Sequence, residues 1–147
     1  MKRILSVRND LLSTGHQGLP ALVSAFGDKT YSHVSGDVEL IGFGGGVFET
    51  VGSTCRDIFL ELVRCRTCGM CGERGGKLRG PNAYEEFFKK DYAKWWKKHR
   101  GKTLIELRIV HAEWTLANGA CRPEETKAEL AELRKGVYRK PKLTSSL

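Results

Sequence analysis

Three cysteines lie within seven residues, and their Cys-x2-Cys-x2-Cys spacing is the pattern in this chain best suited to chemistry. They are Cys65, Cys68 and Cys71, and Gly69 and Gly72 stand between and after them. A Cys-x2-Cys turn lets two thiolates reach one metal ion, and neighbouring glycines relax the backbone around it. The spacing therefore predicts a metal-binding knuckle.

A tetrahedral zinc site needs a fourth ligand, and either Cys55 or Cys121 is favoured over His111 and His33. The predicted ligands of a structural zinc ion are Cys65, Cys68, Cys71 and Cys55. Reduced thiols without a metal are the second interpretation. An iron–sulfur cluster ranks lower because the Cys-Pro continuation of the bacterial motif is missing. A disulfide comes last, because the chain has an odd number of cysteines, five, and three of them are crowded into seven residues. This distribution is not typical of a disulfide framework and points to a reducing compartment.

The positive charge of the chain is concentrated in one segment. The net charge is +8, yet residues 1–76 hold eight basic and eight acidic side chains, whereas residues 77–102 hold nine basic and three acidic ones. A concentrated basic surface attracts polyanions, and counterion release strengthens its binding to nucleic acids. The alternative interpretation is a solvated face that gives solubility.

Tryptophans are interleaved with these basic residues. Trp95 and Trp96 are adjacent, and neighbours on a helix lie about 100° apart, so we expect one of them to be exposed and able to stack on a base. The alternative is that these aromatic residues simply form a core. The predicted nucleic-acid contacts are Lys89, Lys90, Lys94, Trp95, Lys97, Lys98, Arg100, Lys102, Arg139 and Lys140.

Three successive helices must position these side chains. Capping-box pairs mark the first two helix starts, at Asn82 with Glu85 and at Thr103 with Glu106. The third helix begins near Pro123, since proline is favoured in a first helical turn. Together they predict a small helical domain.

The first half of the chain predicts a mixed module. Residues 31–41 and 47–51 have the β-branched and aromatic content of short strands. Ser53 is the expected N-cap of a helix that leads into the cysteines. Residues 72–80 contain four glycines and are the expected linker.

The segment from Gly80 to Lys90, Gly-Pro-Asn-Ala-Tyr-Glu-Glu-Phe-Phe-Lys-Lys, resembles the opening of an HMG box, one residue shorter in its spacing. Gly-Lys-Thr at 101–103, with Glu106 and Trp114, resembles the second helix of that family, and residues 124–138 resemble the third. The resemblance covers residues 80–140. The chain is also similar to YABBY-like proteins, in which a cysteine-based zinc module precedes an HMG-like segment.

This resemblance implies binding in the DNA minor groove with an apolar wedge that bends the duplex. Here the wedge position falls near Glu85, which cannot intercalate. The implied function is therefore backbone binding through lysines, without strong kinking.

The sequence predicts an α+β protein: a small Gly-rich mixed module with a Cys-rich knuckle in residues 1–76, an all-α three-helix HMG-box-like domain in 77–140, and a tail in 141–147. No Ser/His/Asp set or paired carboxylates stand out, so we expect a protein that is not an enzyme.

The predicted function is architectural, sequence-tolerant binding to the DNA or RNA backbone. One alternative is a structural component of a large protein or ribonucleoprotein assembly, such as a virion capsid or an organellar ribosome. Another is a small inhibitor or regulator that binds a partner protein. No apolar run approaches the roughly 18 residues that a membrane span needs, and no secretory signal is evident. We therefore expect an intracellular location, in the nucleus, an organelle or a virion, without membrane insertion.

Overall fold

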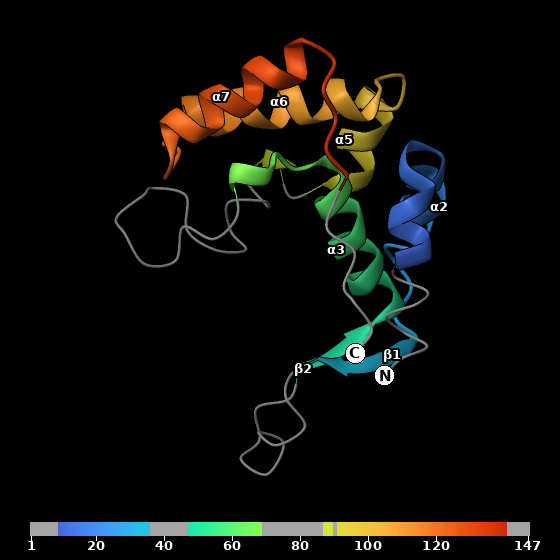
Figure 1. The fold of residues 1–147 in the computed structure, drawn as a ribbon. Helices are drawn as coiled ribbons and strands as arrows, with labels where there is room; N and C mark the ends of the chain where they lie inside the picture. Colours follow the sequence, from blue (N-terminus) through green and yellow to red (C-terminus); the bar gives the residue numbers. More distant parts are fainter. Residues whose placement is uncertain (1–8, 36–46, 69–86, 90, 141–147) are drawn as a thin grey trace. The chain divides into compact units, whose positions relative to one another are not determined.

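The fold was analysed in a computed structural model that describes residues 9–35, 47–68, 87–89 and 91–140 (Figure 1). The chain divides into two compact units. The described residues of the first unit end at Leu60, and those of the second begin at Glu61. The predicted boundary between residues 76 and 77 lies outside the described residues.

The first unit contains a 3-10 helix η1 (Gly15–Gly18), helix α2 (Leu19–Ser24), strands β1 (Tyr31–Ser35) and β2 (Val47–Thr50), and most of helix α3 (Val51–Val63). The two strands are antiparallel and irregular between Tyr31 and His33. Its buried apolar side chains are Leu12, Leu19, Leu22, Ile58 and Phe59.

Helix α3 begins earlier than the sequence indicated. Ser53 was the expected N-cap, but the helix starts at Val51, and Thr50 and Ser53 exchange hydrogen bonds in the manner of a capping box. The Thr50 N–H donates to Ser53 Oγ over 2.9 Å, and the Ser53 N–H donates to Thr50 Oγ1 over 3.2 Å. Thr50 therefore takes the N-cap position, and Ser53, the expected N-cap, lies in the first turn with its own amide bonded to Thr50.

Gly52 allows the first turn of α3 to approach the loop after α2. Its N–H donates to the carbonyl of Asp28 over 2.9 Å, and a side chain at this position would meet the carbonyl oxygens of Phe26 and Asp28. The ring of Phe26 packs edge-on against Phe59, with 5.4 Å between centroids. These contacts hold α3 against the loop.

The α+β fold class is wrong. Helices dominate the described residues, and the two short strands there form a sheet of two strands only, which is too small to make a mixed module. The physical reason is that the strands are only five and four residues long, and an isolated pair of this size buries little surface.

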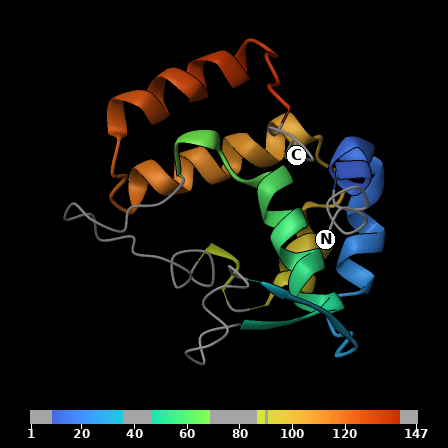
Figure 2. The ribbon, with the colours of Figure 1, turned by 60° about the horizontal axis from the view of Figure 1, so that its bottom comes forward.

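The second unit contains a short 3-10 helix η3 (Arg66–Cys68) and helices α5 (Tyr92–His99), α6 (Leu104–Ala117) and α7 (Pro123–Arg134). Helices α6 and α7 lie side by side in both views (Figures 1 and 2), and η3 contacts α7. Cys65, Ala112 and Leu130 form a buried cluster, against which Ile109 and Leu116 pack.

Local sequence signals account for the ends of α6 and α7. The predicted capping box of Thr103 and Glu106 is present, as is Pro123 in the first turn of α7. Gly136 has φ +82° and follows α7, where the Val137 N–H donates to the Glu132 carbonyl over 3.1 Å. This is the Schellman arrangement that a left-handed glycine permits.

A single first helix running from Asn82 to the lysines is wrong. Phe88 and Lys89 form a turn, and Lys89 has a left-handed φ of 50°. The carboxylate of Asp91 then accepts the Lys94 N–H over 2.9 Å and caps a new helix, α5. The expected Asn82–Glu85 capping box lies outside the described residues.

Candidate functional site

Helix α5 carries three exposed lysines on one side. Lys94, Lys97 and Lys98 are spaced at i, i+3 and i+4, which places them on the same helical face, here called the lysine face. The opposite side of the helix carries Tyr92, Trp95, Trp96 and His99, all buried or half-buried. The polar side of α5 is therefore entirely basic apart from Ala93.

The lysine face has no acidic counterpart within the described part of the chain. No ion pair there involves Lys94, Lys97 or Lys98. Lys97 and Lys98 lie in the last turn of α5, where cations are favoured by the helix dipole. Within the described part of the chain, no carboxylate therefore neutralises these three ammonium groups.

The other predicted nucleic-acid contacts are placed unequally. Lys89, Arg100 and Lys140 are exposed, whereas Lys102 is half-buried. Arg139 is exposed but already forms an ion pair with Glu132 at 2.9 Å. Lys90 lies outside the described residues. The three lysines of α5 therefore form one surface, whereas the guanidinium of Arg139 is paired with Glu132.

The expectation of an exposed tryptophan beside these lysines is wrong. Trp95 is 9% exposed and Trp96 is 8% exposed. Tyr92 and His99 lie between them on the helical wheel, so the two indoles mark the two edges of one buried stripe about 100° wide. Two neighbouring residues can therefore both be buried, and Trp95 is not available for stacking on a base.

Trp95 belongs to an aromatic cluster. Its ring centroid lies 4.8 Å from that of Phe88, 5.3 Å from Phe87 and 4.4 Å from His99. Phe87 also packs edge-on against His111 at 4.6 Å and against Trp114 at 5.3 Å. The aromatic core that the sequence offered as the alternative interpretation is the one observed.

The surroundings of the His99 imidazole disfavour its protonated form. Its Nδ1 atom is buried and has no hydrogen-bond partner among the described residues. Burial first, and then the nearby charges of Lys98 and Lys102, lower the pKa of His99 below its ordinary value. Its surroundings therefore favour the neutral form of His99.

The described cysteines are in different chemical states. Cys55 and Cys65 form no disulfide with any described residue, and they belong to different compact units. Burial, followed by the carboxylate of Asp28, raises the pKa of the Cys55 thiol. Cys121, in the loop between α6 and α7, is disulfide-bonded, although the sequence favoured a disulfide least. Its partner is not among the side chains that the structure describes.

The zinc site stays a prediction. The side chains of Cys68 and Cys71 lie outside the described residues, and the rest of the described chain contains no group of three possible metal ligands. Cys65 is fully buried, and its Sγ atom lies 3.3 Å from Nδ1 of His111, which also accepts the Cys65 N–H over 3.1 Å. This pairing fixes the start of η3 against α6.

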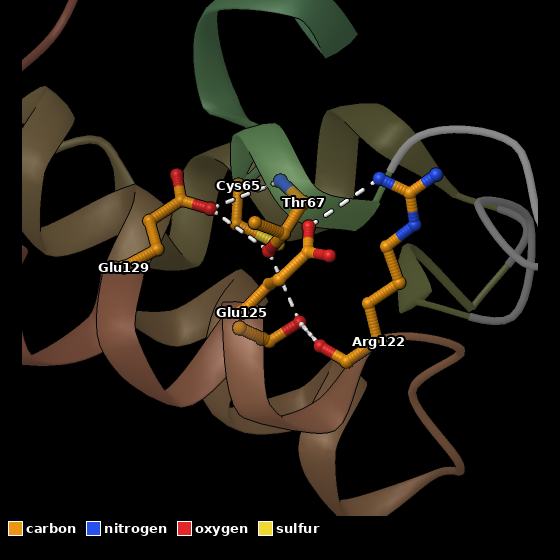
Figure 3. Close-up of polar contacts among 6 residues, drawn as sticks. Cys65, Thr67, Arg122, Glu125 and Glu129 are labelled. Carbon is orange, nitrogen blue, oxygen red and sulfur yellow. Dashed lines mark hydrogen bonds and ion pairs between the residues drawn. The ribbon is translucent and has the colours of Figure 1, made fainter.

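A polar network then fastens η3 to α7 (Figure 3). The carboxylate of Glu129 accepts hydrogen bonds from the Arg66 N–H over 2.7 Å, the Thr67 N–H over 3.0 Å and the Thr67 hydroxyl over 2.9 Å. The Thr67 hydroxyl also lies 3.0 Å from that of Thr126. Glu129 thus satisfies the free amides at the start of η3, as a capping carboxylate does.

Sequence analysis missed Arg108, although a signal was present. Its neighbours Leu107, His111 and Ala112 repeat at helical spacing on the buried side of α6, and Arg108 falls on the same stripe. A charged residue at a core position is unusual and marks a structural or binding role. Glu129 and Thr67 carried no comparable signal, because their contact joins residues 62 positions apart.

No helix among the described residues combines the length and the hydrophobicity needed to cross a bilayer. The chain matches no protein family, no curated protein and no solved structure, so the lysine face, the aromatic core and the polar network themselves have to carry the functional argument.

Proposed function

We propose that this protein binds the phosphate backbone of nucleic acids through the lysine face of α5, with little dependence on sequence and without catalysis. The observation that carries the proposal is the grouping of Lys94, Lys97 and Lys98 on one exposed helical side with no acidic partner in the described residues. Phosphate contacts position a protein on nucleic acid without reading the bases.

Two further features support backbone binding over base recognition. Exposed Lys89 and Arg100 flank α5 at its two ends and extend the basic surface. The tryptophans beside the lysines are buried, so no exposed indole of α5 is offered to a base. For an electrostatic surface of this kind, we expect the affinity for nucleic acid to depend strongly on salt concentration and weakly on base sequence.

The first prediction concerns salt. The affinity for labelled DNA and RNA duplexes of unrelated sequences should fall steeply between about 50 and 200 mM salt, because bound lysines release counterions. The triple variant Lys94→Gln, Lys97→Gln, Lys98→Gln should reduce the slope of log K against log salt by about 3, since each phosphate contact contributes about 0.9. Fluorescence anisotropy measures both quantities.

A matched control removes the same charge from another helix. Lys127, Arg134 and Lys135 are exposed at the surface of α7 and its end, and their replacement by Gln lowers the net charge equally. The control should keep the wild-type slope, because the lysine face is intact. Equal losses in both variants, or no duplex binding by the wild type at about 50 mM salt, would overturn the proposal.

A further inference from the structure

The second unit contains a pocket of about 390 Å³ on one side of α7. Its wall includes four arginines that come from four different segments: Arg66 from η3, Arg108 from α6, Arg122 before α7, and Arg139 after α7. Their positions in the sequence are far apart, so folding of the unit brings them together. Figure 3 shows Arg122 beside Glu125 and the network at Glu129.

Arg108 is the largest fully buried side chain described, and it is 1% exposed. Nε donates to the Leu62 carbonyl over 2.9 Å, Nη1 to the Arg139 carbonyl over 3.0 Å, and Nη2 to the Glu61 carbonyl over 3.4 Å. These bonds use three of the five N–H groups of a guanidinium. The Tyr138 ring covers its central carbon at 4.5 Å.

The three carboxylates in the pocket wall are already engaged. Glu125 pairs with Arg122 at 3.3 Å, and Glu132 pairs with Arg139 at 2.9 Å. Glu129 accepts the hydrogen bonds from the backbone of η3 described above. No ion pair within the described residues involves Arg66 or Arg108.

Among the residues that the structure describes, two arginines of one pocket thus form no ion pair with a carboxylate. Burial most strongly lowers the pKa of Arg108, while Glu129 opposes this and the charge of Arg66 adds to it. Arg66 and Arg108 both line this pocket, so two like charges border the same space. A buried cation without an ion pair is costly, and an anion between two guanidinium groups would offset that cost.

We propose that this pocket binds a small molecule through one oxyanion, a carboxylate or a phosphate, held between Arg66 and Arg108. Arginine is suited to this role because its planar fork donates two parallel hydrogen bonds to either group. The volume is at the lower end of the range for small-molecule sites. This inference goes beyond nucleic-acid binding and uses none of the lysine face.

The test is an NMR titration of the intact protein with sodium phosphate and, separately, with sodium acetate, at ionic strength held constant with sodium chloride. We expect saturable shifts of the Arg108 Nε–H and of backbone amides in the wall, such as Thr67 and Ala128. Stronger saturation by phosphate assigns a phosphorylated ligand, and stronger saturation by acetate assigns a carboxylate. Shifts that grow linearly with both anions overturn the proposal.

Two single variants make the test specific. Arg66→Gln removes an exposed guanidinium of the pocket and should weaken the anion affinity by about tenfold, since a charge-assisted bidentate contact is lost. Arg134→Gln removes an exposed arginine that lies outside the wall and should change it by less than about twofold. Equal effects of the two would contradict the assignment.

The Lys94→Gln, Lys97→Gln, Lys98→Gln variant separates the two proposals. Its pocket shifts should saturate as in the wild type, because the lysine face does not line the pocket. Saturation that disappears in this variant would place the bound anion on α5 and overturn the pocket assignment. A failure of nucleic-acid binding would leave the pocket titration unaffected.

Discussion

Arg108 shows how one charged side chain can hold several segments together. It lies on the buried stripe of α6 and donates to carbonyls at residues 61, 62 and 139. Its charge is delocalised over the guanidinium and lies against the ring of Tyr138, an arrangement that stabilises a buried cation. The residue therefore joins the end of α3, α6 and the chain after α7.

Replacing Arg108 should be costly for this reason. Arg108→Met keeps much of the volume but leaves three carbonyls without their donor, so we expect the free energy of unfolding to fall by about 3 kcal/mol. Arg134→Met, at an exposed position of α7, should change it by less than about 0.5 kcal/mol. Urea denaturation followed by circular dichroism measures both, and equal losses would contradict the role of Arg108.

His99 gives the folded state a pH dependence with a definite sign. Its folded pKa is lowered, so near pH 6 the unfolded chain binds more protons than the folded one. Stability should therefore be complete above the ordinary histidine pKa of about 6.5 and decrease as the pH falls through the lower folded value. His99→Phe should reduce the difference in the free energy of unfolding between pH 7 and pH 5.5, measured by urea titration. An unchanged difference would show that other groups cause the pH dependence.

At the scale of elements, helix ends were the most predictable feature. The start of α6 follows from Thr103 and Glu106, and that of α7 from Pro123, because capping and proline effects act within one turn. The predicted start of the helix that carries the lysines was wrong. Both Asn82 and Asp91 are suitable N-caps, and local sequence rules do not decide which of the two starts the helix. The burial of both tryptophans depends on packing from two directions, which spacing alone does not reveal.

The capping box of α6 provides the prediction at this scale. Thr103→Ala removes the oxygen that accepts the Glu106 N–H and should lower the free energy of unfolding by about 1 kcal/mol. Thr103→Ser retains the hydroxyl and should preserve most of the stability. Thermal unfolding compares the two variants, and similar losses in both would show that the methyl group of Thr103, rather than the cap, matters.

At the scale of the whole molecule, the location of the charge can be predicted from the sequence, whereas the pairing of the cysteines cannot. The net charge of +8 could be assigned to the second half of the chain from the sequence, because charge requires no knowledge of the fold. Cysteine pairing could not, since it depends on which loops meet. Cys121 stands fifty residues after Cys71 in the sequence, and only the fold decides whether they approach.

The disulfide at Cys121 predicts a thiol count. Two of the five sulfur atoms are then joined, so at most three thiols should react with a chromogenic disulfide reagent in the denatured, unreduced chain. All five should react after reduction. In the native state Cys65 should react slowest, because it is fully buried. Five reactive thiols before reduction would show that Cys121 is a free thiol.

The buried indoles of α5 determine what optical measurements can report. Trp95 and Trp96 are two of the three tryptophans in the chain, and both are shielded from water. Their emission should lie at short wavelength and resist quenching by iodide. A nucleic acid on the lysine face would therefore leave the fluorescence spectrum almost unchanged, and a red shift during a titration would report loosening of the aromatic core instead of contact with bases.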